Sequence, residues 1–227
     1  MAPFGASRAG LMSVAKDDIP DSAISQYDAS DSDTVVTSNG TVVEWQDKIG
    51  DNDLTGSFSS VEDGAVNGLD ALLSDGVDDE MDVAYSQSVE PPFTTIFVFE
   101  QVSDTDQGTL LSNVGDRQYY ANRDDDRWLF QIDDFDNISH PSGTNETFIH
   151  TVIWDSTMEF YQNGTFVGNP DVNAIGLDGL AVAYRPDEDD RHHNLRNCEI
   201  RVYDSGLDSE TRESEESGLA DKWGVSI

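Results

Sequence analysis

The most chemically suggestive stretch of the chain is a run of charges flanked by aromatic residues near its middle. Its members are Tyr119, Arg123, Asp124, Asp125, Asp126 and Trp128. Aromatic faces meet the apolar faces of sugar rings, while carboxylate and guanidinium groups bind pairs of hydroxyls. Carboxylate oxygens are also the ligands that calcium prefers, so calcium is the one cofactor that this stretch suggests. The stretch therefore predicts a carbohydrate-binding loop, with calcium as a candidate for ordering it.

The same stretch also has an interpretation that needs no ligand. Runs of charge are usually solvated. An acidic hairpin tip between two strands whose aromatic residues face the core would give the same sequence. Under this alternative Trp128 is a core residue.

A second cluster joins two histidines to a run of acids. His192 and His193 follow the charged residues 187–191, and imidazoles with carboxylates can hold a transition metal. The spacing matches no zinc pattern, however, and adjacent side chains in a strand point to opposite faces. We therefore expect a solvated loop here, and we expect the isolated His140 and His150 to be structural.

The net charge of the chain limits its partners. There are 46 Asp and Glu residues against 12 Lys and Arg residues, for a formal net charge of -34. In molar salt the Debye length falls to about 3 Å, so neighbouring carboxylates hardly repel one another. The charge thus indicates a halophilic archaeon or one of its viruses as the source, with calcium binding as the functional alternative. It argues against nucleic acid and anionic membranes as partners, and it favours neutral glycans or other proteins.

Cysteine content and hydropathy indicate the cellular compartment in which the protein is made. Cys198 is the single cysteine, so no intramolecular disulfide can form, and its place on a strand predicts an unreactive core thiol. No stretch approaches the roughly 20 apolar residues of a membrane span, so we expect no membrane insertion. Residues 1–15 include Arg8 and lack a continuous apolar block, which argues against a signal peptide. We expect the protein to be made and assembled in the cytoplasm.

Most of the chain reads as short strands separated by turns. With 37% hydrophobic residues in 227, it can bury one core. The apolar run 93–102 is typical of a central strand covered on both faces, and Asn163-Gly164 is the strongest turn dipeptide. Strand signals occur near 24–27, 42–45, 71–73, 81–85, 93–102, 109–111, 118–121, 128–132, 148–154, 158–161, 177–185 and 198–204. This pattern predicts an all-β fold over residues 24–227, a two-sheet antiparallel jelly-roll sandwich.

The last thirty residues organise this sandwich. In residues 198–204 apolar side chains alternate with Glu199 and Arg201, which predicts a strand buried on one face and wet on the other. Asp208 or Ser209 can cap a helix that ends before Gly224. The predicted fold therefore closes with one short C-terminal helix.

Residues 1–23 differ from the rest of the chain. They are rich in Gly, Ala and Ser, a composition too poor in large side chains for a core strand or a strong helix. Phe4, Arg8, Leu11 and Met12 are the larger side chains that we expect to make contacts. We predict an N-terminal arm that anchors the sandwich to other protein chains or holds a homo-oligomer together.

The end of the sequence resembles the close of concanavalin A-like lectin and glucanase domains of the laminin G-like type. In those domains a strand E-I-x-V-Y-D is followed by L-S-x-x-E-R and then by L-A-x-K-W-G. The matching residues are Glu199, Ile200, Val202, Tyr203, Asp204, Leu207, Arg212, Leu219, Ala220, Lys222, Trp223 and Gly224. Three further marks occur upstream in the expected order, at 45–50, 74–79 and 160–164. The resemblance covers residues 24–227 and implies the sandwich fold.

The resemblance does not imply hydrolysis. Glucanases of this superfamily carry E-x-D-x-x-E on one strand, because a retaining mechanism needs a nucleophile and an acid about 5 to 5.5 Å apart. Glu44, Glu100 and Glu159 stand alone on their strands, so we expect no enzymatic activity.

A location on a virion would account for three expectations together: adaptation to salt, an anchoring arm and the lack of an export signal. Tailed viruses display modules of this superfamily as capsid or tail appendages, and the chain is similar to such an appendage. We therefore predict a virion surface protein of a haloarchaeal virus, a turret or decoration, whose lectin-like domain contacts host surface glycans or a surface glycoprotein. A purely structural, capsid-stabilising protein without a ligand is the alternative, and a glycan-active enzyme comes third.

Overall fold

The apolar run predicted to be a central strand is β8 (Phe93–Gln101) in the computed structural model. It pairs with β13 (Thr147–Trp154) on one side and with β17 (Asn194–Tyr203) on the other, and only Glu100 among its residues is not buried. The structure describes residues 19–103, 108–114, 118–123, 127–132, 134–139, 143–186 and 191–227. A strand covered on both faces needs apolar side chains at every position, which explains the continuous run.

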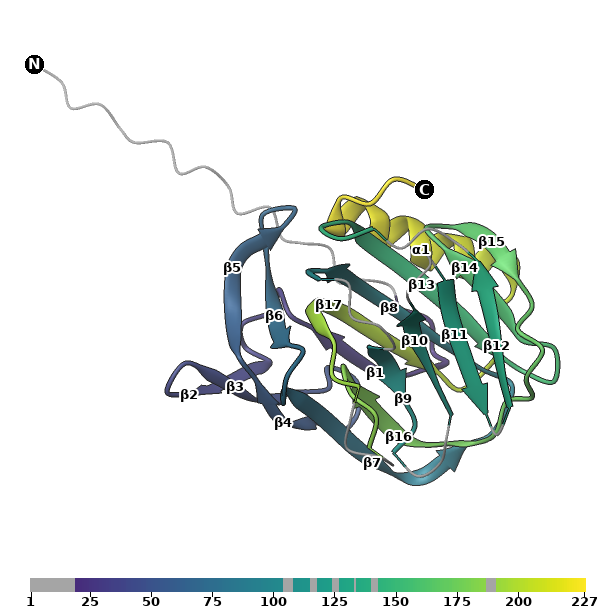
Figure 1. The fold of residues 1–227 in the computed structure, drawn as a ribbon, viewed down its shortest axis with the longest axis horizontal. Helices are drawn as coiled ribbons and strands as arrows, with labels where there is room; N and C mark the ends of the chain where they lie inside the picture. Colours follow the sequence, from purple (N-terminus) through teal and green to yellow (C-terminus); the bar gives the residue numbers. More distant parts are fainter. Residues whose placement is uncertain are drawn as a thin grey trace, which may run out of the picture.

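Two antiparallel sheets make up the molecule (Figure 1). The helix-covered sheet has the order β15-β14-β13-β8-β17-β6-β5, with β1 beside β17, and the opposite sheet has the order β12-β11-β10-β9-β16-β7-β4-β3-β2. The other strands are β1 (Ala23–Asp28), β2 (Val35–Ser38), β3 (Thr41–Trp45), β4 (Leu54–Phe58), β5 (Ser60–Val66), β6 (Leu69–Asp75), β7 (Glu80–Val89), β9 (Thr109–Ser112), β10 (Gln118–Arg123), β11 (Arg127–Ile132), β12 (Asp134–Ser139), β14 (Glu159–Gln162), β15 (Thr165–Gly168) and β16 (Leu177–Val182). The predicted all-β sandwich is confirmed.

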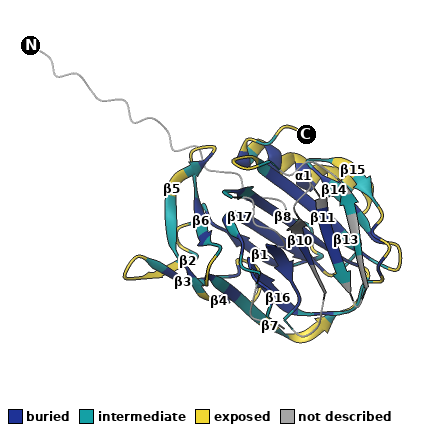
Figure 2. Cartoon of the chain, viewed as in Figure 1, coloured by how far each residue is buried: buried dark blue, intermediate teal, exposed yellow. Residues whose placement is uncertain are grey.

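Aromatic side chains from both sheets fill the space between them. Phe99 of β8 lies 6.2 Å from Trp128 of β11, and Phe130 of β11 lies 5.2 Å from Phe160 of β14, measured between ring centroids. Each of these four rings is fully buried. In Figure 2 central strands such as β8 and β16 are mostly dark blue, for buried, whereas β2, β5, β7 and β15 are mostly teal or yellow, for intermediate or exposed. The larger apolar cluster of the described residues therefore lies between the two sheets, and a second cluster lies under the helix.

Helix α1 (Ser209–Trp223) covers the outer face of the helix-covered sheet. Asp208 caps it by accepting a hydrogen bond from the backbone N–H of Thr211 at 2.8 Å. At its other end Gly224 takes the left-handed conformation, with φ of 73°, and donates its backbone N–H to the carbonyl of Ala220. The predicted C-terminal helix is confirmed, with Asp208 as the cap.

The prediction that β17 is wet on one side is wrong. Glu199 and Arg201, the charged residues of that alternation, are only 1% and 5% exposed. Helix α1 covers them, because Leu219 and Trp223 pack on the outer face of the sheet beside Cys198. A burial of charge on this scale needs ion-pair partners.

The start of the described chain joins the sandwich at the end of β17. Ile19 packs against the apolar cluster under the helix, and Ser22 accepts a hydrogen bond from the backbone N–H of Asp204 at 2.9 Å. Residues 1–18 lie outside the described ranges, and so do the anchoring contacts predicted for Phe4, Arg8, Leu11 and Met12. Within those ranges no helix has the length and apolarity needed to cross a bilayer.

Candidate functional site

The predicted carbohydrate-binding stretch falls on the β10–β11 hairpin. Tyr119 and Arg123 are backbone members of β10, and Trp128 is the second residue of β11. Asn122 pairs with Trp128, and Arg123 pairs with Arg127. Asp124, Asp125 and Asp126 lie outside the described residues. The hairpin is therefore present, and a site formed by its tip stays a prediction.

The structure corrects the role predicted for Trp128. Its side chain is fully buried between the sheets, 4.4 Å from the ring of His150, and its indole N–H donates to Oε1 of Gln162 at 2.8 Å. Alternate residues of a strand point to opposite faces, and this position of β11 points into the core. Trp128 thus cannot offer its face to a sugar, and the alternative of a core aromatic on the flanking strand holds for this residue.

The two adjacent histidines have different surroundings. His193 is fully buried, and burial lowers the pKa of its imidazole to about 4. His192 is half-buried, with Nδ1 lying 3.1 Å from the carbonyl oxygen of Asp79 and its ring stacked on Tyr184. The acidic residues 187–190 lie outside the described ranges. The solvated loop expected at these two residues is therefore wrong for His193, which is buried, and the metal alternative stays untested.

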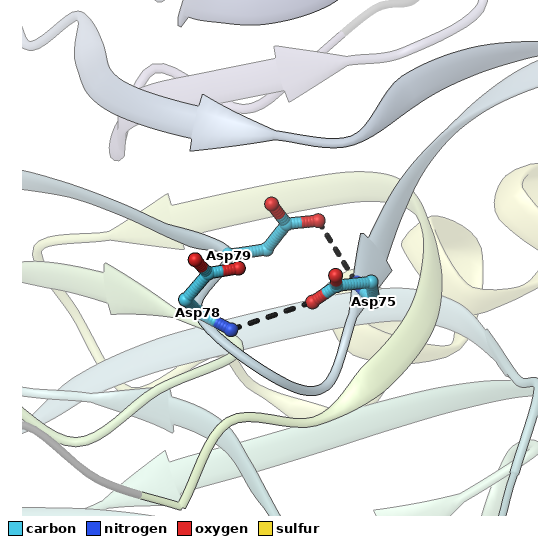
Figure 3. Close-up of side chains that lie close together, drawn as sticks. All are labelled: Asp75, Asp78 and Asp79. Carbon is cyan, nitrogen blue, oxygen red and sulfur yellow. Dashed lines mark hydrogen bonds between the residues drawn. The ribbon is translucent and has the colours of Figure 1, made fainter.

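Three carboxylates gather at the turn between β6 and β7 (Figure 3). One oxygen atom from each of Asp75, Asp78 and Asp79 lies within 4.8 Å of the others, and calcium prefers such oxygen donors. Asp79, however, accepts backbone N–H groups of Ser59 at 2.8 Å and Asp75 at 2.9 Å, and Asp75 accepts that of Val77 at 2.8 Å. These bonds fix the turn and tie it to the preceding hairpin, so the mark at 74–79 is accounted for as turn chemistry.

The motif residues at the end of the chain, which carry the family resemblance, attach the helix to the sheet. Oε1 of Glu199 accepts hydrogen bonds from Gln26 at 2.9 Å and Arg201 at 2.8 Å. Oε2 of Glu199 accepts from Lys222 at 2.7 Å and from the indole N–H of Trp223 at 3.1 Å. A buried carboxylate is tolerated when it is paired and hydrogen-bonded in this way. The residues that carry the family resemblance therefore build the fold and leave the ligand open.

A groove opens where helix α1 begins. It encloses about 390 Å³ and lies between the end of β13, strand β14 and the first turn of the helix. The side chains that matter most for its chemistry are Asp155, Glu159, Tyr161, Asp208, Ser209 and Arg212. An aromatic ring beside carboxylates and a hydroxyl is the combination expected of a site for polar, ring-shaped ligands.

Contacts within the groove fix its polar groups. The hydroxyl of Tyr161 donates to Oε2 of Glu159, and burial together with this carboxylate raises the pKa of Tyr161 to about 12, so the phenol stays protonated. The guanidinium of Arg212 lies 3.9 Å from the centre of the Tyr161 ring and pairs with Glu216 and Glu213. The backbone N–H of Thr211 lowers the pKa of Asp208, so this carboxylate stays charged.

An exposed aromatic ring stands next to the groove. Phe166 of β15 pairs with Tyr161 of β14 across the hairpin, their ring centroids lie 5.4 Å apart, and Phe166 is 50% exposed. Sequence reasoning missed this arrangement because its residues run from Pro92 to Arg212. The available signal was in the marks themselves, since both Tyr161 and Arg212 belong to them.

Comparison with known proteins supports the fold. No model of a protein family matches the sequence, and no curated protein matches it. Among solved structures, Trypanosoma rangeli sialidase has a TM-score of 0.60 at 11% identity, over 91% of this chain and 34% of that one. The binding domain of botulinum neurotoxin DC in complex with rat synaptotagmin II has a TM-score of 0.61 at 14% identity, over 88% and 52%. The same domain in complex with SialylT has a TM-score of 0.60 at 15% identity, over 88% and 52%.

These similarities support the two-sheet β sandwich fold. The chain spans about one third of the sialidase and about half of the toxin chain. At this level of identity the likeness concerns the fold, because one fold hosts many functions.

Proposed function

We propose that this chain is a glycan-binding, lectin-like module displayed on the surface of a virion of a haloarchaeal virus. The observation that carries the binding role is the groove at the start of α1, where carboxylates and a hydroxyl lie beside Tyr161 and the exposed ring of Phe166. Apolar sugar faces pack on aromatic rings, and sugar hydroxyls donate to carboxylates. Two of the similar structures are named as complexes with sialic acid and with SialylT, so a sandwich of this fold can carry a glycan site, although the sugar can differ from protein to protein.

The module binds glycans without cleaving them. Glu100 pairs with Arg196, Glu44 accepts from Gln46, and Glu159 accepts from Tyr161, so each of these acids has a partner of its own. Their strands lack the paired carboxylates of a retaining hydrolase. The likeness to a sialidase covers a third of that enzyme and is therefore no argument for sialidase activity.

Charge and the N-terminal arm support the virion assignment. A formal charge of -34 suits a surface that faces molar salt, where screening is short-ranged. Residues 1–16 contain Arg8 and Lys16 and no acid, so a cationic arm leads into an acidic domain and could bind other acidic virion proteins or a second copy of the chain. Calcium is the candidate cofactor for the acidic loops.

Glycan binding is tested with the purified protein and host envelope glycoprotein in molar NaCl. Phe166→Ala removes an exposed ring and should weaken binding roughly fivefold, because a sugar ring stacked on an aromatic face contributes on the order of 1 kcal/mol. Val77→Ala, which trims a 71% exposed side chain at the β6–β7 turn, is the matched control. Equal binding by both variants would remove the groove as the site.

The purely structural alternative has its own support. Glu199, Lys222 and Trp223, which belong to the sequence marks, serve the fold, as does the turn at 74–79. If the intact protein binds no host glycan and deletion of residues 1–18 abolishes incorporation into particles, the chain is a capsid-stabilising protein. Retained incorporation after the deletion would refute the anchoring role of the arm.

A further inference from the structure

We infer that the groove at the start of α1 selects sugars by charge, taking a pyranose with a free amino group in preference to a neutral one and rejecting sugars that carry a carboxylate. This inference rests on the proposed glycan-binding function and names its ligand class. It stands on the groove as a formed cavity with an exposed ring beside it.

The carboxylates of the groove come from three separate elements. Asp155 follows strand β13, Glu159 begins strand β14, and Asp208 caps helix α1. Asp155 and Glu159 are half-buried, and Asp208 is exposed, so all three remain accessible from the groove. Three acids around one cavity of about 390 Å³ give its surface a negative potential.

Among the described residues that line the groove, Arg212 is the one cation, and it is not available to a ligand anion. Arg212 is 5% exposed, its guanidinium lies over the Tyr161 ring at 3.9 Å, and its nitrogens pair with Glu216 and Glu213. An exposed guanidinium, which can form two parallel hydrogen bonds, is a common partner of a sugar carboxylate, and none of the described residues that line the groove offers one. A carboxylate in this groove would instead meet three like charges.

An ammonium group in the groove would be attracted by these three carboxylates. Hydrogen bonds with an ionised donor or acceptor are about twice as strong as neutral ones, and an ammonium adds to them the Coulomb attraction between its charge and the carboxylates, which a hydroxyl lacks. A sugar that packs its apolar face on Phe166 can direct a ring substituent toward Glu159, because Phe166 lies beside Tyr161 and Tyr161 donates to Glu159. The groove should therefore bind a sugar with an ammonium group at this position more tightly than a sugar with a hydroxyl there.

Three probes test the inference at the lowest salt concentration at which the protein stays folded, because molar salt screens the charges on which the selection depends. They are glucosamine, methyl glucoside and sialic acid, measured by ligand-observed NMR or calorimetry. We expect glucosamine to bind roughly tenfold more tightly than methyl glucoside, equivalent to about 1.4 kcal/mol, and sialic acid to bind most weakly. Sialic acid that binds as well as methyl glucoside would overturn the charge selection while leaving glycan binding intact. If none of the three binds, both the function and its ligand class are overturned.

Isosteric variants locate the selection. Glu159→Gln removes one charge, and Asp208→Asn removes another while keeping an efficient helix cap. Each variant should reduce the difference in affinity between glucosamine and sialic acid several-fold, because each removes one negative charge from the cavity. Asp63→Asn makes the same charge change at an exposed residue of strand β5, which lies at the opposite edge of the sheet from β14 and β15. It should leave the difference in affinity between the two sugars unaltered. An unchanged difference in affinity in both groove variants would contradict the inference.

Discussion

Lys222 and Glu199 form an ion pair of 2.7 Å that joins the last turn of helix α1 to strand β17. The same ammonium reaches Asp28 of β1 at 2.8 Å. Helix, last strand and first strand thus meet at one cation. In a protein with few basic residues, this position uses one of them to hold three elements together.

Removing Glu199 should be costly. Glu199→Ala leaves Arg201 and Lys222 without a shared acceptor beneath the helix, and loss of one partner of a buried ion pair costs about 3–5 kcal/mol of unfolding free energy. Denaturant unfolding measures the loss. Asp221→Asn, an exposed change on the same helix, should alter stability by less than about 0.5 kcal/mol. A Glu199→Ala protein as stable as this control would show that the network adds nothing.

Trp128 should behave as a core residue. Trp128→Ala should cost roughly 3–5 kcal/mol, because it removes a large buried ring and leaves Gln162 without its indole donor. Trp128→Phe keeps most of the packing and should cost less. Melting curves of the two variants provide the measurement. A stable Trp128→Ala protein with impaired glycan binding would instead place the ring at the surface.

His193 should make stability depend on acid pH. Burial lowers its pKa from 6.5 to about 4, so the unfolded chain takes up a proton before the folded one does. Its contribution is therefore fully present above pH 6.5 and is lost as pH falls toward 4. Unfolding free energies between pH 4 and 7 should fall less steeply in His193→Phe than in the parent.

Two features of the protein bear on that comparison. Burial raises the pKa of Glu216, which gives a pH dependence of the opposite sign, but this group is common to all variants. His192→Phe, on the neighbouring half-buried ring, is the control. A parent and a His193→Phe variant with the same slope would exclude a buried neutral imidazole.

Salt should stabilise the fold. At a formal charge of -34, surface carboxylates repel in dilute buffer, and molar KCl shortens the range of this repulsion to about 3 Å. The melting temperature should therefore rise steeply between dilute and molar salt, measured with a chelator present so that calcium does not contribute. A flat curve would remove the argument for a halophilic source.

The sequence predicted elements best where local chemistry was strong. The run at β8 and the turn at Asn163-Gly164, with φ of 50° and 73°, appear where expected, and Asp208 caps the helix. Strand β5 was missed because its polar sequence, Ser60–Val66, lacks strand propensity, and pairing with β6 determines its structure. Tertiary pairing can override local preference in this way.

The candidate site was less predictable than the fold. Charged Glu199 and Arg201 indicated a wet face, since the sequence does not reveal that Lys222 and Glu215 neutralise them from the helix. The groove likewise gathers residues far apart in the chain, and only the folded structure brings Glu159 next to Asp208. The adjacent acids at 124–126 form a stronger pattern in the sequence than the groove residues do, but a binding site requires side chains that come together in space.

Strand β1 gains its neighbour β17 only after all the strands between them in the sequence have been synthesised. Ala23 is paired with Tyr203, and β17 also separates β8 from β6. Such long-range pairing delays folding, because the entropy of closing a long loop is lost before the contacts form. On the ribosome the nascent sandwich therefore lacks the middle of one sheet until β17 has emerged.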